Sequence, residues 1–201
     1  MGAGPKIDRI EKNFLINGNF DYWQRIVANN LQNGVGGAPY GADRWKIFPS
    51  TVTNNAAHVQ RAASTNIGSK YDMNFGPFGA NEKMGAAQII ESLLTNRLKT
   101  KTVTFSVYLK SGAASNLRLE LLAWTGAADA PTGFSNAVPY TNWTTYSLAA
   151  GFTSIAVKAI TTTTGYVKYE VTGVVPANCN NLICIMSYDQ DAGQQHYASQ
   201  A

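Results

Sequence analysis

The sequence predicts an all-β protein: a jelly-roll β-sandwich of about nine or ten strands with a short N-terminal arm. Several segments alternate apolar and polar residues with a period of two, and turns rich in Gly, Pro and Asn recur at spacings near ten. No segment has the helical periodicity of a major helix. Alternation by itself does not separate a jelly roll from other sandwiches. We expect an arm at 1–12, the sandwich at 13–188 and a polar C-terminal tail at 189–201.

The clearest strand prediction is a hairpin-connected pair in the middle of the chain, joined by a turn at 112–116. In the first strand the inward positions are apolar: Val103, Phe105, Val107 and Leu109. In the second strand the inward positions are Leu117, Leu119, Leu121 and Ala123, and the outward ones are Arg118, Glu120, Leu122 and Trp124. Strict alternation of this kind is typical of half-buried strands.

The other elements follow from weaker patterns. Strands are predicted from Asp43 and within 51–63, 84–91 and 143–148. Further strands are predicted at 155–159 with Ile155, Val157 and Ala159 inward, at 167–171 with Val167, Tyr169 and Val171 inward, and at 182–188, an apolar and central strand. The segments 26–42, 64–83 and 125–142 are predicted to be loops because they are rich in turn residues. Ser92 to Leu98 is predicted to form one helical turn with Ser92 as its N-cap.

The composition favours an extracellular or virion protein over a cytosolic enzyme. Charged residues make up only 14% of the 201 residues, and Asn, Gln, Ser, Thr and Gly supply the polarity. The net charge is +4, but the basic residues are dispersed, so no nucleic-acid surface is expected. No segment resembles a signal peptide or a membrane span, so no membrane insertion is expected.

The two cysteines, Cys179 and Cys184, are predicted to be buried free thiols, which suits assembly in a reducing host cytoplasm. A disulfide between them would require a tight turn at Asn180 and Asn181. No cofactor is expected. A structural calcium held by Asp189 and Asp191 is the only metal that the sequence suggests, and two carboxylates are few for this ion.

The densest motif is 13–25, which contains two of the four tryptophans when it is joined to Ala42–Trp45. The Asn17-Gly18 pair predicts a turn between two strands. Trp23 and Trp45 are predicted to be core residues, and the arginines here are expected to bind Asp21, Asp43 or turn carbonyls. The motif is therefore interpreted as scaffold.

This motif also carries a family resemblance. The run from Asn13 to Phe20, followed by Trp23-Gln24-Arg25, resembles the opening of a domain found in bacteriophage tail-fibre and related virion proteins. Ala42–Trp45, Gln88–Glu91 and Lys101–Tyr108 are similar to later blocks of that family. The resemblance implies a jelly roll like those of carbohydrate-binding modules, carried on a virion appendage. The chain departs from the family at 191–195, where the usual closing motif is missing.

Carbohydrate binding needs exposed aromatic rings beside polar groups. Trp124 is the best candidate, together with Arg118 and Glu120 on the same strand and Phe134, Asn136 and Tyr140 in the following loop. The alternative is that Trp124 packs under that loop or at a subunit interface. Tyr71, Phe75 and Phe78 form a second candidate, with a plug over one edge of the core as the alternative.

The predicted function is a non-enzymatic phage virion protein, in a tail fibre or head fibre, that binds host-surface carbohydrate. Its expected partners are other virion proteins, and a homotrimer is expected by analogy with fibre-like appendages. The first alternative is a capsid decoration, neck or fibre-joint protein without a glycan ligand. The second is a weak glycan hydrolase that uses Glu91 or Glu120. The chain has only two histidines and no G-x-S-x-G element, so enzymatic activity is not expected.

Overall fold

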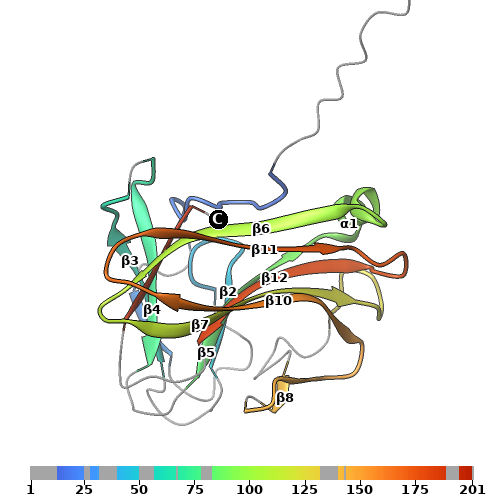
Figure 1. Cartoon of the computed structure of the whole chain (residues 1–201). Helices are drawn as coiled ribbons and strands as arrows, with labels where there is room; N and C mark the ends of the chain where they lie inside the picture. The colour runs from blue at the N-terminus through green and yellow to red at the C-terminus, as the bar shows by residue number, and fades with distance from the viewer. Residues whose placement is uncertain are drawn as a thin grey trace, which may run out of the picture.

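The computed structural model describes residues 13–24, 28–31, 40–49, 57–66, 68–77, 83–131, 140–142, 144–188 and 195–200. The described residues form thirteen strands and one short helix. Two antiparallel sheets pack face to face, with β6 and β11 above β12, β7 and β10 in Figure 1. The predicted all-β jelly-roll sandwich is confirmed, although the prediction of nine or ten strands was too low.

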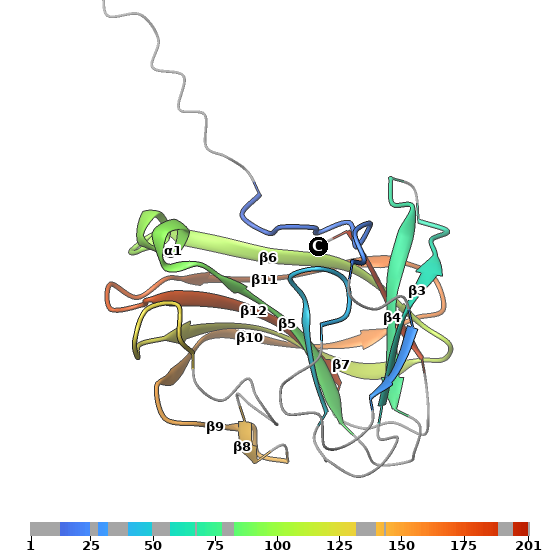
Figure 2. The same ribbon diagram turned by 180° about the vertical axis from the view of Figure 1, so that it is seen from behind.

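The first sheet has six strands, in the order β1 (Ala28–Leu31), β3 (Ala57–Ala63), β4 (Tyr71–Pro77), β13 (His196–Ser199), β6 (Thr102–Ser111) and β11 (Val167–Val174). The second has five strands, in the order β10 (Phe152–Thr162), β7 (Ser115–Trp124), β12 (Asn181–Tyr188), β5 (Met84–Ile90) and β2 (Lys46–Pro49). A short hairpin of β8 (Tyr140–Asn142) and β9 (Ser147–Leu148) lies below β10 in the two opposite views of Figures 1 and 2.

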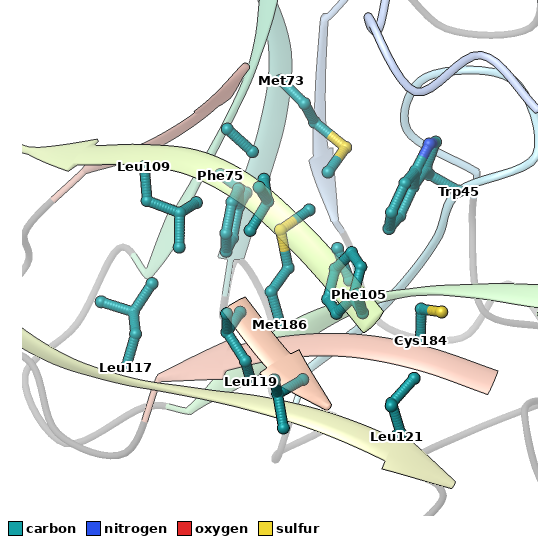
Figure 3. Close-up of a cluster of buried hydrophobic side chains, with 14 of the residues drawn as sticks. Trp45, Met73, Phe75, Phe105, Leu109, Leu117, Leu119, Leu121, Cys184 and Met186 are labelled. Atoms are coloured by element: carbon teal, nitrogen blue, oxygen red, sulfur yellow. The ribbon is translucent and has the colours of Figure 1, made fainter. Parts of the chain in front are cut away.

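The main core lies between the two sheets. Side chains from β6 and β4 meet those from β7 and β12, as Figure 3 shows for Phe105, Phe75, Leu119 and Met186. All four are at most 2% exposed. The inward positions predicted for β6 and β7 therefore form the core, because alternate residues of a strand point to the same face.

A second apolar layer covers the outer face of the five-stranded sheet. Tyr140, Tyr146 and Leu148, in and around the β8–β9 hairpin, pack against outward residues of the sheet such as Ile183 and Ile185. Every residue of β12 is consequently buried. The prediction that β12 is a central apolar strand is confirmed, since it lies between β7 and β5.

Several local predictions are wrong. Ala28–Leu31, predicted to be loop, is β1; residues 144–146 of the predicted strand 143–148 form a turn; and Val167 of β11, predicted to point inward, is 40% exposed. Residues 13–24 contain a turn but no strand, and Tyr71–Pro77, predicted to be loop, is β4. In the predicted tail, His196–Ser199 is a strand between β4 and β6. In β10, a bulge between Ser154 and Ala156 shifts the register, so Val157 lies outward and is 41% exposed.

The helix α1 (Ser92–Leu98) forms where it was predicted, but Ser92 is not its cap. The N-cap position is Glu91, which makes no side-chain capping bond. Instead, the carboxylate of Asp129 accepts hydrogen bonds from the backbone nitrogen and the hydroxyl of Ser92, both at 2.7 Å. A residue from a distant loop thus supplies the cap, which no local pattern predicts.

Candidate functional site

Residues 13–24, which we call the signature segment, are held to the sandwich through the side chain of Asn17. Its amide nitrogen donates to the carbonyl oxygens of Tyr22 at 3.0 Å and Asp43 at 3.1 Å. Its amide oxygen accepts from the backbone nitrogen of Tyr22 at 3.0 Å. Asn17 has a φ of 55°, a conformation that asparagine tolerates better than most residues. One side chain thereby joins the turn at 16–19 to the turn before β2.

Three aromatic side chains here, Phe20, Trp23 and Trp45, are structural. Trp45 and Phe20 are fully buried in the main core, and the indole nitrogen of Trp45 donates to the carbonyl of Asn17 at 3.2 Å. Trp23 is 9% exposed. The prediction that the tryptophans are scaffold is therefore confirmed.

The polar contacts of the segment differ from the predicted ones. Asp43 accepts from the backbone nitrogen of Gln24 at 2.9 Å. Arg44 forms an ion pair with Glu91 at 2.9 Å. Arg25 lies outside the described residues.

Trp124, the leading sugar-binding candidate, is buried. It points outward from β7 as predicted, but it is only 4% exposed, and its indole nitrogen donates to the carbonyl of Ala127 at 2.8 Å. Gly126 and Gly151 pass over the ring so closely that a Cβ atom on either would lie 2.2 or 2.4 Å from it. The prediction of an exposed ring is wrong, and the alternative that Trp124 packs under the following loop is correct.

Two of the other predicted site residues, Arg118 and Tyr140, contact a third, Glu120, which is 1% exposed. Its carboxylate accepts from the Tyr140 hydroxyl at 2.6 Å and from the Arg118 guanidinium at 3.3 Å. It also accepts from the Ser154 hydroxyl at 3.1 Å. Both carboxylate oxygens are therefore occupied, and Glu120 fastens the β8–β9 hairpin to the sheet.

Electrostatics supports this structural role. Burial, and then the neighbouring Glu120 carboxylate, raise the pKa of Tyr140 well above its ordinary value, so its hydroxyl remains a donor. The Arg118 guanidinium stacks 4.1 Å from the centroid of the Tyr146 ring, and 23% of its side chain is exposed. Phe134 and Asn136 lie outside the described residues.

A different surface presents aromatic rings to solvent. It lies on the outer face of the six-stranded sheet, and we call it the tyrosine face; its members are Tyr108, Lys110, Tyr166 and Tyr197, all half-buried. The Lys110 ammonium lies 4.4 Å from the ring centroid of Tyr166 and 4.9 Å from that of Tyr197. It also donates to the Thr65 hydroxyl at 3.3 Å. The lysine thus orders two rings from distant segments.

Amide and carboxyl groups lie beside these rings. The Gln195 side-chain oxygen accepts from the Tyr197 hydroxyl at 3.1 Å and from the Asn74 amide at 3.0 Å. The Tyr166 hydroxyl donates to the carboxylate of Asp72, which is fully buried in β4. Burial, and then this bond, raise the pKa of Tyr166. The surface therefore combines apolar ring area with hydrogen-bonding groups.

The tyrosine face was not predicted from the sequence. Because Val107 and Leu109 are predicted to point inward, the same alternation directs Tyr108 and Lys110 outward, and this was the one available signal. Tyr197 fell in the predicted tail, and Tyr166 fell outside the predicted elements. Only the pairing of β13 with β6 and β4 brings these segments together.

The structure describes only some of the remaining predicted site residues. Phe75 is fully buried in the core, so it is not a surface aromatic, while Phe78 lies outside the described residues. Cys179 and Cys184 are buried free thiols, as predicted. Asp189 and Asp191 also lie outside the described residues, and the described residues contain no group of three or more metal-ligating side chains. No described helix is long and apolar enough to cross a membrane.

The fold is that of carbohydrate-binding modules. A family 61 module solved with β-1,4-galactotriose has a TM-score of 0.52 at 12% identity, with 94% of each chain covered. A family 4 module has a TM-score of 0.52 at 12% identity, with 92% of this chain and 99% of that one covered. The C-terminal family 22 module of Clostridium thermocellum Xyn10B has a TM-score of 0.50 at 12% identity, with 86% and 92% covered. No protein-family profile and no curated protein sequence matches the chain.

Proposed function

We propose that this chain is a non-enzymatic phage virion protein that binds host-surface carbohydrate through the tyrosine face. The observation that carries the proposal is the gathering of Tyr108, Tyr166 and Tyr197 on one outer sheet face beside amide and carboxyl groups. The C–H faces of a sugar can pack on such rings, and its hydroxyls can bond to the polar groups. The similarity of the fold to carbohydrate-binding modules agrees with this proposal.

The proposed location on a tail fibre or head fibre rests on the sequence resemblance of the 13–25 and 42–45 blocks. In the structure the described residues of these blocks form the corner around Asn17 and the buried Trp45, so the resemblance falls on residues that stabilise the fold. Other virion proteins and further copies of the chain, as a homotrimer, are the proposed partners. Linking several weak sugar sites would raise the overall avidity through effective concentration.

The contact surface proposed here differs from the one expected from sequence. Of the described residues in that first set, Glu120, Trp124 and Tyr140 are at most 4% exposed. Arg118 retains some exposed area, but Glu120 and Tyr146 hold its guanidinium. Sugar stacking at Trp124 would require removal of the loop that covers it.

The test is binding of the purified protein to host cells and to polysaccharide extracted from them. Tyr197→Ala is expected to weaken binding, and Tyr197→Phe to retain most of it because the ring remains. Tyr22→Ala is the matched control, since Tyr22 is 68% exposed and lies outside the tyrosine face. Equal binding by Tyr197→Ala and Tyr22→Ala would contradict the assignment of the surface. Absence of binding by the unchanged protein, together with stable incorporation into particles, would favour the purely structural role.

A further inference from the structure

The carboxylate of Asp72 is incompletely satisfied. Asp72 lies on the outward side of β4 and is 0% exposed. One oxygen, Oδ2, accepts the Tyr166 hydroxyl, whereas Oδ1 has no hydrogen-bond donor within the described part of the chain. The described ion pairs do not include Asp72. The Oδ1 atom of Asn74, two residues along the same strand, also lacks a donor among the described residues.

Such an arrangement is unusual in a protein interior. Buried polar atoms are nearly always hydrogen-bonded, and a buried acceptor without a donor costs about 1–3 kcal/mol, more when it is charged. The neighbouring cation does not compensate, because the Lys110 ammonium is directed to two tyrosine rings and Thr65. A ligand that supplied the missing donor would offset this free-energy cost.

On the basis of the proposed function, we infer that Asp72 is a ligand-binding residue of the tyrosine face, and that its ligand is a neutral, hydroxyl-rich saccharide. Asp72 is covered in the unbound protein, so a sugar hydroxyl would reach Oδ1 and donate to it when the half-buried Tyr166 ring moves aside. Asn74 would accept from a second hydroxyl about 7 Å away along the strand. A carboxylate or phosphate on the sugar would instead face the charge of Asp72, so acidic saccharides are disfavoured.

The decisive variant is Asp72→Asn. Asparagine has the same shape and keeps an oxygen for the Tyr166 hydroxyl, but it places a donor where the free acceptor was. We expect Asp72→Asn to bind a neutral host polysaccharide about 10-fold or more weakly, the loss expected for one hydrogen bond to a charged group. Its melting temperature should be unchanged or higher, because a buried carboxylate has been removed. Asp21→Asn is the matched control, since Asp21 also has a buried oxygen without a donor but lies in the signature segment.

A measurement on the unchanged protein makes the inference testable even if Asp72→Asn fails to fold. The neutral polysaccharide, its O-methylated form, and an acidic polysaccharide such as polygalacturonate are compared by calorimetry. Only the unmethylated neutral form is expected to bind. Equal binding of the methylated form, stronger binding of the acidic one or of a single-stranded oligonucleotide, or full binding by Asp72→Asn would overturn the role of Asp72. If the unchanged protein binds no saccharide, the proposed function itself fails.

Discussion

Replacing Asn17 by alanine separates a scaffold residue from a binding residue. The change removes three hydrogen bonds, two to the backbone of Tyr22 and one to Asp43 in the turn before β2, each worth about 1 kcal/mol. It also places alanine at a φ of 55°, where a residue other than glycine or asparagine costs roughly 1 kcal/mol more. The expected loss is therefore about 3–4 kcal/mol. In a domain of this size each kcal/mol lowers the melting temperature by about 2–4 °C, so we expect a decrease of about 10 °C.

Urea and thermal unfolding measure this effect, with Asn19→Ala as the control. Asn19 lies in the same turn and is exposed, and no hydrogen bond of its side chain is recorded among the described residues. Asn17→Gly keeps the backbone freedom but not the amide, so it should be about 1 kcal/mol more stable than Asn17→Ala. Saccharide binding by the folded fraction should remain unchanged in all three. A difference below about 0.5 kcal/mol between Asn17→Ala and Asn19→Ala, the usual scatter of surface substitutions, would refute the reasoning.

Three further predictions concern Trp124, Asp129 and the two cysteines. Trp124→Ala should destabilise the protein by about 3–5 kcal/mol in urea unfolding, because the ring is buried, and should leave saccharide binding by the folded fraction intact. Loss of binding with little change in stability would instead show that Trp124 is a binding residue. The hydrogen bonds from Ser92 lower the pKa of Asp129, so the stability it contributes is present at neutral pH and lost as pH falls through the folded pKa. Asp129→Asn should therefore lower the melting temperature at pH 7, and this decrease should become smaller as the pH falls below 3.8, the ordinary pKa of aspartate; a decrease that stays constant with pH would contradict this. Burial raises the pKa of Cys184 to about 12 and also raises that of Cys179. Neither thiol should therefore react with iodoacetamide at pH 8 until denaturant is added, and rapid labelling of the native protein would be inconsistent with the fold.

The sequence by itself determined which side of β6 and of β7 faces the core. In β6, the residues at the positions of Phe105, Val107 and Leu109 are buried as the alternation predicts. The aromatic density of the signature motif likewise predicted a buried corner, because large rings beside apolar residues gain most from burial. These are local properties, and period-two alternation reports them directly.

Only the tertiary structure decided what lies against the outward faces. Trp124 is on the predicted side of β7, but Gly126 and Gly151 pass over its ring, since a sheet face is open or covered according to which other segments pack there. Likewise, β13 joins the sheet between β4 and β6 and brings Tyr197 beside Lys110 and Asn74. Alternation shows the direction of a side chain from its own strand and carries no information about partners dozens of residues away. That is why the core could be predicted from the sequence while the candidate binding face could not.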